Sequence, residues 1–364
     1  MGIKTGCINL KEFEPKKIRD RGIIIGRLPV GKKNCITDVD GVKVGHVELD
    51  YALDGDGEHV CTGVTAILPH GENLFMKKVV GASYVLNGFG KTTGLLQVNE
   101  LGVIESPIML TNTFAVPAVA QGTLQYMLEE NPEIGDSTGT INLVVGECND
   151  GKLNSIRTQP IQPSHSRACI RNASSDVTPE GAVGAGKGMI CFGYKGGIGS
   201  SSRIIKSEGN GSTYTIGCIV LSNFGKKEDF HSSKYIINEK GDTPSISNTS
   251  SGSIIIVLAT DAPLSSRQLL RVAKRCGIGL GRTGSHFSHS SGDIVIAFST
   301  AHKIPHFSNE SVEIRSQLRE DHSIMNDLFL GAVEVTEEAI LNSLSQAVTT
   351  KGRMGNIVHS YPFQ

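Results

Sequence analysis

The sequence predicts one α/β domain in which β-sheets are covered by layers of helices. Glycine is abundant, at 43 of 364 residues, while tryptophan is absent, so many backbone segments must turn tightly or approach one another closely. Short runs rich in valine and isoleucine recur along the chain and indicate many strands. Segments with helical spacing lie between these runs, which indicates that helices cover the sheets.

The expected strands are short and almost entirely apolar, which indicates burial on both faces. They lie at 42–48, 65–68, 141–145, 189–192, 214–221, 254–259 and 294–298. The polar stretch 232–251 is interpreted as a long loop within one domain, because strand-like segments flank it closely.

Three helices are expected from apolar residues at helical spacing. The first begins near Val116, with Pro117 in its first turn and Pro132 beyond its end. The second covers about 266–280. The third follows Thr336 and has two acidic residues in its first turn, where the helix dipole favours them. Its acidic residues and its apolar face are Glu337, Glu338, Ile340, Leu341, Leu344 and Val348.

Composition excludes several classes of function. With 35 Lys and Arg against 36 Asp and Glu, the net charge of -1 offers no basic field for nucleic acid or for a membrane surface. The eight cysteines are too scattered for a metal clasp or a disulfide scaffold, so we expect reduced thiols. The N-terminus lacks a signal-peptide core, and no run approaches the ~20 apolar residues of a membrane helix. We therefore expect a cytoplasmic protein that binds its partner in a pocket.

Two glycine-rich segments and one histidine pair invite other interpretations. Segment 87–94 (NGFGKTTG) ends like a phosphate-binding loop, but Val85 occupies the position that requires glycine. Segment 184–203 lacks a strand-glycine-helix unit and is interpreted as close-packed loops that line a pocket. His286 and His289 lie among serines and glycines, so we interpret them as structural or solvent-facing residues. No metal or other cofactor is expected.

The dipeptide Gly252-Ser253 marks a change from a polar loop to an apolar strand. A serine hydroxyl directly after glycine can attack the preceding carbonyl when a rigid strand strains the turn. Hydrolysis of the resulting ester would leave Ser253 as a new N-terminus. Its free α-amine, with a pKa of about 7.7–8.0, would then act as a general base beside its own hydroxyl.

Eight segments, in the same order along the chain, carry a resemblance to a known family. They are ITDVDGVKVGHV (36–47), GVTAILPHG (63–71), NGFGKTTGLLQVNELGVIESPIMLTNT (87–113), VVGECNDGKLN (144–154), CFGYKGGIGSSSR (191–203), VLSNFG (220–225), GSIIIVLATDAPL (252–264) and SSGDIVIAFSTA (290–301). Over nearly its whole length the chain resembles the L-aminopeptidase D-Ala-esterase/amidase family, the DmpA-type enzymes that include the β-aminopeptidases.

The resemblance implies a four-layer αββα sandwich similar to that of the N-terminal nucleophile hydrolases. It also implies a precursor that is cleaved between Gly252 and Ser253 into chains 1–252 and 253–364. The mature protein would be a homo-oligomer of four cleaved protomers. Its substrates would be short peptides or aminoacyl amides and esters, with no nucleic acid and no membrane as partner.

The resemblance also implies roles for individual residues. Ser253 corresponds to the nucleophile, and Asn223 corresponds to the donor that stabilises the oxyanion. Ser291 and Asp293 correspond to the hydroxyl and the carboxylate that orient the nucleophile. Glu147 corresponds to the acid that binds the free amine of the substrate.

One position departs from the family, since Asn149 stands where some members carry an aromatic hydroxyl. Asn149 is expected to line the pocket or to donate a hydrogen bond. The predicted function is a self-cleaving serine aminopeptidase that works through an acyl-enzyme. An acyltransferase of the ornithine acetyltransferase kind is the first alternative, although that kind usually has threonine at the new N-terminus. A non-enzymatic nucleotide- or metabolite-binding protein is the second.

Overall fold

The computed structural model describes residues 14–55, 57–207, 211–235 and 252–363. Its longer helices are α1 Leu95–Leu101, α2 Val116–Glu130, α3 Pro163–Arg171, α4 Ser266–Ala273, α5 Cys276–Thr283 and α6 Ile324–Ser345. Its strands are β1 Lys43–Ala52, β2 His59–Leu68, β3 Lys77–Gly88, β4 Val103–Ile104, β5 Ile108–Asn112, β6 Val144–Cys148, β7 Ile190–Cys191, β8 Tyr194–Lys195, β9 Gly197–Lys206, β10 Thr213–Asn223, β11 Ser253–Thr260, β12 Gly292–Pro305, β13 Thr350–Lys351 and β14 Ile357–Val358.

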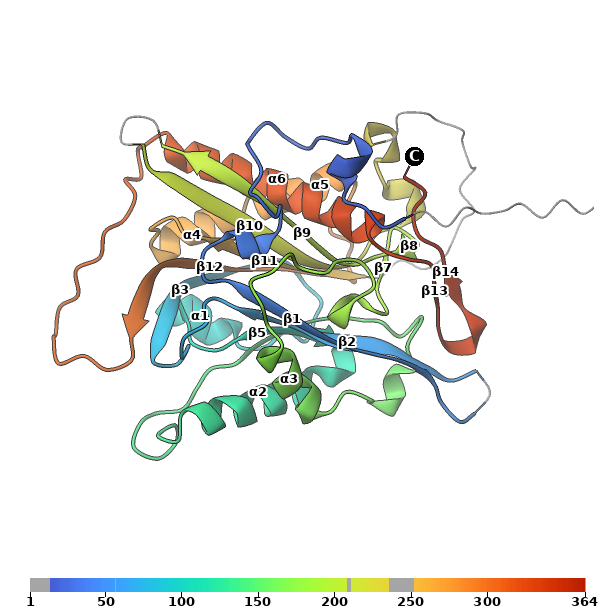
Figure 1. Cartoon of the computed structure of the whole chain (residues 1–364), viewed down its shortest axis with the longest axis horizontal. Helices are drawn as coiled ribbons and strands as arrows, with labels where there is room; N and C mark the ends of the chain where they lie inside the picture. The colour runs from blue at the N-terminus through green and yellow to red at the C-terminus, as the bar shows by residue number, and fades with distance from the viewer. Residues whose placement is uncertain (1–13, 56, 208–210, 236–251, 364) are drawn as a thin grey trace, which may run out of the picture.

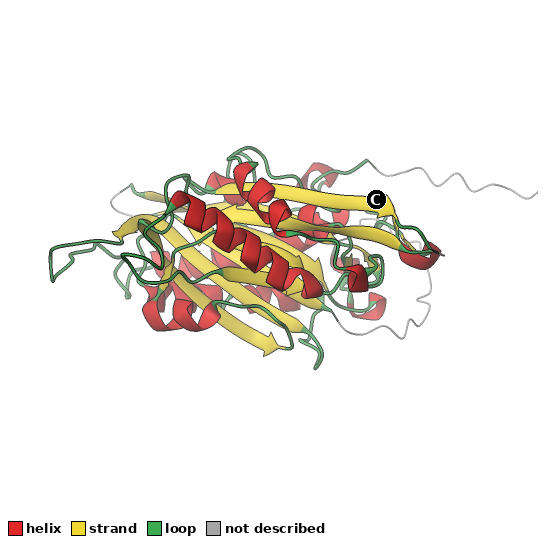
Figure 2. Ribbon diagram, turned by 90° about the horizontal axis from the view of Figure 1, so that it is seen from below, coloured by secondary structure: helices red, strands yellow, loops and turns green. Residues whose placement is uncertain are grey.

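The main elements form four layers, which confirms the predicted αββα sandwich (Figures 1 and 2). A four-stranded sheet has the order β1-β2-β5-β6, and a six-stranded sheet has the order β4-β3-β12-β11-β10-β9. The two sheets face each other. Helices α2 and α3 cover the outer face of the smaller sheet, and α4, α5 and α6 cover the outer face of the larger one.

Strand β11 shows why the predicted strands are apolar throughout. Ile254, Ile256 and Leu258 pack with side chains of α4, α5 and α6. Ile255 and Val257 point the other way, into the core between the two sheets. Because successive side chains of a strand alternate between its faces, a strand with both faces buried has no polar position to reveal its period.

Several strand predictions need correction. The run 65–68 is only the end of β2, and the run predicted at 141–145 is shifted to β6, Val144–Cys148. Strands β3, β5 and β9 were not predicted. β9 falls in the glycine-rich segment 184–203, where close-packed loops were expected. A Cβ atom on Gly199 would lie 1.9 Å from the Ala339 carbonyl oxygen, so glycine at this position lets α6 lie directly against the strand.

The helix predictions are right in place and partly wrong in extent. Helix α2 is confirmed, whereas the second helix is divided into α4 and α5. The break lies at Lys274 and Arg275. Within α5, a Cβ atom on Gly279 would lie 2.5 Å from the Val333 carbonyl oxygen, so glycine there lets α5 lie directly against α6. Helix α6 begins at Ile324 rather than after Thr336, and Val348 lies beyond its end, half exposed.

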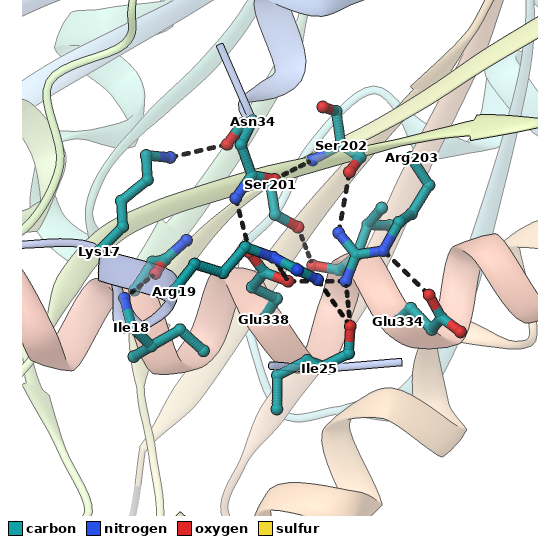
Figure 3. Close-up of polar contacts among 12 residues, drawn as sticks. Lys17, Ile18, Arg19, Ile25, Asn34, Ser201, Ser202, Arg203, Glu334 and Glu338 are labelled. Atoms are coloured by element: carbon teal, nitrogen blue, oxygen red, sulfur yellow. Dashed lines mark hydrogen bonds and ion pairs between the residues drawn. The ribbon is translucent and has the colours of Figure 1, made fainter. Parts of the chain in front are cut away.

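The acidic residues expected in the first turn of the third helix lie instead near the middle of α6, where Glu338 is buried (Figure 3). The Arg203 guanidinium of β9 contacts the Glu338 carboxylate at 2.6 Å and the Glu334 carboxylate at 2.9 Å. Arg19 contacts Glu338 from the N-terminal segment at 2.8 Å. Although burial alone would raise the pKa of Glu338, these charges hold it below its ordinary value. The cluster joins segments from both sides of residue 252.

Two further expectations concern exposure and cysteine chemistry. His286 and His289 are exposed, as predicted, and the cysteines of the described segments are free and buried.

The predicted loop 232–251 lies outside the described residues from position 236 onward. Among the helices that the structure describes, none is long and apolar enough to cross a membrane.

Candidate active site

Three neighbouring strands of the six-stranded sheet bring the predicted site residues together at one end. Asn223 is the last residue of β10, and Ser253 is the first residue of β11 directly opposite it. Asp293 is the second residue of β12 and lies opposite Ile254. Ser253 is 30 positions from Asn223 and 40 positions from Asp293 along the chain. The three residues come together because β10 ends, and β11 and β12 begin, at the same end of the sheet.

The Ser253 side chain is buried, and its hydroxyl oxygen accepts a hydrogen bond from the Gly292 amide at 3.1 Å. Glycine at position 252 has a structural reason: a Cβ atom there would lie 2.0 Å from the Asn223 carbonyl oxygen and 2.6 Å from the Phe224 Cα. No real Cβ atom makes such contacts. The peptide bond before Ser253 is therefore packed directly against the end of β10.

The Asn223 side-chain amide is held at both ends. Its Oδ1 accepts a hydrogen bond from the Ile190 amide at 2.9 Å, and its Nδ2 donates one to the Asn149 carbonyl oxygen at 3.0 Å. An amide NH₂ group carries two hydrogens, so one hydrogen of Nδ2 is left for a further acceptor. This arrangement suits a donor to a developing oxyanion.

The Ser291 hydroxyl donates a hydrogen bond to Asp293 Oδ1 at 2.6 Å. Burial raises the pKa of Asp293 to about 6, and this hydrogen bond opposes the rise. Within the described segments, Asp293 Oδ2 is buried without a hydrogen-bond partner. Asn87 Nδ2 fixes the turn before the strand by donating to the Ser291 carbonyl at 2.5 Å and the Ser288 carbonyl at 3.0 Å.

Glu147 reaches the site from β6 of the other sheet, and its side chain is buried. Its Oε1 accepts a hydrogen bond from the Lys91 amide at 2.8 Å, and its Oε2 accepts one from the Thr113 hydroxyl. A Cβ atom on Gly90 would lie 3.3 Å from Glu147 Oε1 and 3.9 Å from the Gly292 Cα. The Glu147 carboxylate thus lies close to the Gly292 backbone that bonds Ser253.

Segment 87–94, which resembles a phosphate-binding loop in sequence, forms the wall between the two sheets at the site. Thr93 bridges to Val145 of β6 with backbone hydrogen bonds of 3.0 and 3.3 Å. The amide next to Gly90 holds the Glu147 carboxylate. Gly90 therefore allows a close backbone approach to an acidic side chain, which occupies the Lys91 N–H group and whose negative charge would repel a phosphate.

A pocket opens beside this cluster, on the side of α5. Its lining residues are Phe224, Gly225, Lys226, Asp229, Gly252, Ser285, His286, Ser288 and Ser291. In the part of the chain that the structure describes, no group of three metal-binding side chains exists.

Sequence reasoning missed the backbone groups of the site. The Asn149 carbonyl oxygen accepts the Asn223 hydrogen bond, whereas the Asn149 side chain is exposed and its predicted role in the pocket stays a prediction. The amides of Lys91, Ile190 and Gly292 have no side-chain signature, since any residue except proline carries the same N–H group. Only the nearby glycines signalled close backbone approaches.

Solved structures with this architecture define the class of protein. The L-aminopeptidase D-Ala-esterase/amidase from Ochrobactrum anthropi, described as a prototype serine aminopeptidase and a variant of the Ntn hydrolase fold, superimposes with a TM-score of 0.86. It is 32% identical, over 96% of each chain. A Burkholderia sp. β-aminopeptidase superimposes with a TM-score of 0.85 and is 33% identical over 95% of each chain. The PH0078 protein from Pyrococcus horikoshii OT3 superimposes with a TM-score of 0.86 and is 46% identical over 95% of this chain and 96% of that one. The fold is therefore an Ntn hydrolase-like α/β fold.

The family follows from the sequence match. Residues 34–358 match peptidase family S58, and the chain belongs to that family. The β-peptidyl aminopeptidase BapA of Sphingosinicella microcystinivorans is 35% identical over 96% of this chain and 90% of its own length. The protein is an aminopeptidase of family S58, which favours the predicted peptidase over the acyltransferase and metabolite-binding alternatives.

Proposed function

We propose that this aminopeptidase activates itself by cleavage between Gly252 and Ser253 and that Ser253 is then its nucleophile. The observation that carries the proposal is the position of Ser253. Its hydroxyl lies at a strand end, bonded to the Gly292 amide, and the peptide bond before it is pressed against Asn223. The rigid strand that follows this bond and the close-packed glycine that precedes it hold the bond in place for attack by the Ser253 hydroxyl.

Self-cleavage would proceed in two balanced steps. The Ser253 Oγ attacks the Gly252 carbonyl carbon, the carbon–nitrogen bond breaks, and the departing nitrogen gains the proton that the hydroxyl loses. Water then hydrolyses the ester, which leaves a carboxylate on Gly252 and a free hydroxyl and α-amine on Ser253. The second hydrogen of Asn223 Nδ2 is the candidate donor to the oxyanion in both steps.

Turnover of a peptide would repeat this chemistry on the substrate. The Ser253 α-amine takes the hydroxyl proton while Oγ attacks, and it returns the proton to the leaving amine. Glu147 would bind the ammonium group of the substrate, because a buried ammonium needs a carboxylate nearby to offset lost hydration. The Ser291–Asp293 pair would orient the Ser253 hydroxyl and amine.

We further propose that the substrates include peptides with an N-terminal β-amino acid. Three relatives carry names that state this specificity: the BapA enzymes of two Sphingosinicella species and the Burkholderia sp. β-aminopeptidase. The p-nitroanilides of β-alanine and L-alanine test it directly. Hydrolysis of the β-alanine compound supports the proposal, and hydrolysis of the L-alanine compound alone contradicts it.

Cleavage is tested by intact mass and N-terminal sequencing of purified protein. We expect chains of 252 and 112 residues (364 − 252 = 112), with Ser253 first in the shorter one. Ser253→Ala should abolish both cleavage and hydrolysis, because one hydroxyl serves both reactions. Turnover by a full-length wild-type chain would refute the proposal. The predicted tetramer of cleaved protomers is checked by light scattering on the same sample.

Glu147→Gln tests recognition of the amine. We expect KM for free-amine substrates to rise at least about tenfold while self-cleavage continues, because the precursor offers no ammonium to this carboxylate. Glu105→Gln is a matched control, since Glu105 is also buried but pairs with Lys78 at 2.5 Å. Equal hydrolysis of N-acetylated and free-amine substrates by the wild type would show that no amine is recognised.

A further inference from the structure

Lys195 is a charged residue that the proposed mechanism does not use, although it is completely buried. Its Nζ donates hydrogen bonds to the carbonyl oxygens of Gly186 at 2.9 Å, Met189 at 2.9 Å and Gly196 at 2.8 Å. An ammonium group has three hydrogens, and these three carbonyls accept all of them. Burial nevertheless lowers the pKa of Lys195 to about 7.

Burying an ammonium group in the protein interior costs free energy. Removing its hydration costs several kcal/mol, whereas a methionine of similar length would pack there without that penalty. The three carbonyl bonds offset part of the cost and draw the two arms of one hairpin together, since Gly186 and Met189 precede β7 and Gly196 follows β8. The lysine therefore helps to hold this hairpin, together with the backbone pairing of β7 with β8 and the hydrogen bond from the Gly196 amide to the Met189 carbonyl at 3.1 Å.

The hairpin in turn contacts the candidate oxyanion donor. The Ile190 amide, directly after the Met189 carbonyl that Lys195 holds, donates to Asn223 Oδ1 at 2.9 Å. The Phe192 amide donates to the Phe224 carbonyl at 2.7 Å, which fixes the hairpin to the same segment a second time. Lys195 Nζ is thus linked to the Asn223 amide through one carbonyl and the next N–H.

The orientation of this amide decides what it can do. The terminal torsion of asparagine is broad and roughly twofold, so external contacts must fix which side of the amide carries the oxygen and which carries the nitrogen. The Ile190 amide selects the oxygen on one side, and the Asn149 carbonyl selects the nitrogen on the other. If the Ile190 amide moves, the NH₂ group loses its alignment with the carbonyl that Ser253 attacks.

We propose that Lys195 is a positioning residue of the oxyanion site, acting on Asn223 through Met189 and Ile190. This inference rests on the proposed role of Asn223, which the experiment tests separately. Lys195 touches no reacting atom. It holds the hairpin so that the Ile190 N–H fixes the direction of the Asn223 amide.

A double-mutant cycle on kcat tests the proposal. All kcat values are taken per cleaved protomer, because Asn223 is also the candidate donor in self-cleavage. Asn223→Ala should lower this kcat by about 10²–10³ with little change in KM. Lys195→Met should lower kcat by about 10–10² in the wild type, because a small misplacement of a donor has an effect of this size. In the Asn223→Ala background, Lys195→Met should have no further effect on kcat. Independent, multiplicative effects would overturn the inference, whereas an unchanged kcat in Asn223→Ala would instead overturn the role of Asn223.

Controls separate positioning from general stability. Lys17→Met removes another mostly buried ammonium, which donates to the Asn34 carbonyl at 2.7 Å and pairs with Glu180 at 2.5 Å. This variant should lose stability without losing kcat. Ile190→Pro removes the N–H group that reaches Asn223, together with the isoleucine side chain, at the first position of a strand, where proline is tolerated. It should reproduce the kcat loss even if Lys195→Met does not fold, and a wild-type kcat in folded Ile190→Pro protein would refute the link.

Discussion

The carboxyl group of Asp293 is expected to destabilise the folded protein at neutral pH, and Asp293→Asn should relieve this. Burial raises its pKa from an ordinary value of 3.8 to about 6. Between these values the folded protein binds more protons than the unfolded chain, so its stability falls as pH rises and stays low above pH 6. The difference corresponds to about 3 kcal/mol of unfolding free energy.

The assay is urea unfolding of Ser253→Ala protein, with and without Asp293→Asn, at pH 4 and pH 8. The Ser253→Ala background keeps a free Ser253 amine out of the comparison. The stabilisation by asparagine should grow by about 2.4 kcal/mol from pH 4 to pH 8, because the unfolded carboxyl is already more than half ionised at pH 4 and all other groups titrate equally in both proteins. Asp321→Asn is the control of opposite sign, because Arg319 lowers the pKa of this exposed carboxyl. A pH-independent difference at Asp293 would refute the reasoning.

Two further predictions concern packing. Arg203→Met leaves the Glu334 and Glu338 carboxylates buried without their main partner, and should lower the unfolding free energy by about 3–5 kcal/mol in urea titrations. Arg319→Met, at an exposed ion pair, should change the unfolding free energy by less than about 0.5 kcal/mol. Equal losses of unfolding free energy in the two variants would contradict the role of burial. Gly252→Ala should slow self-cleavage at least about tenfold in a gel time course, because the added Cβ atom would clash with the Asn223 carbonyl oxygen. The control Gly139→Ala should cleave at the wild-type rate, because the space around Gly139 is open. Normal cleavage of Gly252→Ala would show that the close packing before Ser253 has no part in the reaction.

Much of the fold was predictable where local pattern and tertiary position agree. Runs such as 254–259 are apolar because both of their faces are buried, and α2 has its prolines at the expected ends. β9 was missed because glycine and serine indicate loops locally. In the protein these small residues form a strand because α6 packs against them at backbone distance.

The candidate site shows the same division. Gly252-Ser253 stands out in the sequence because a polar loop meets a buried strand there, and the family resemblance extends the prediction to Asn223, Asp293 and Glu147. Their meeting at one end of the sandwich depends on strand order and register. The contact of the Asn149 carbonyl oxygen with the Asn223 amide could not be predicted, because every residue carries such a carbonyl.

The sequence by itself determined the α/β class, the family and the position of the candidate nucleophile, because side-chain hydrophobicity and motif order are properties of the chain. Only the tertiary structure decided that Glu338 is a buried partner of Arg203 rather than an exposed cap. It alone connected Lys195 to Asn223 through Ile190. Such contacts depend on backbone N–H and carbonyl groups, which every residue type shares, and on desolvation, which exists only once distant segments pack together.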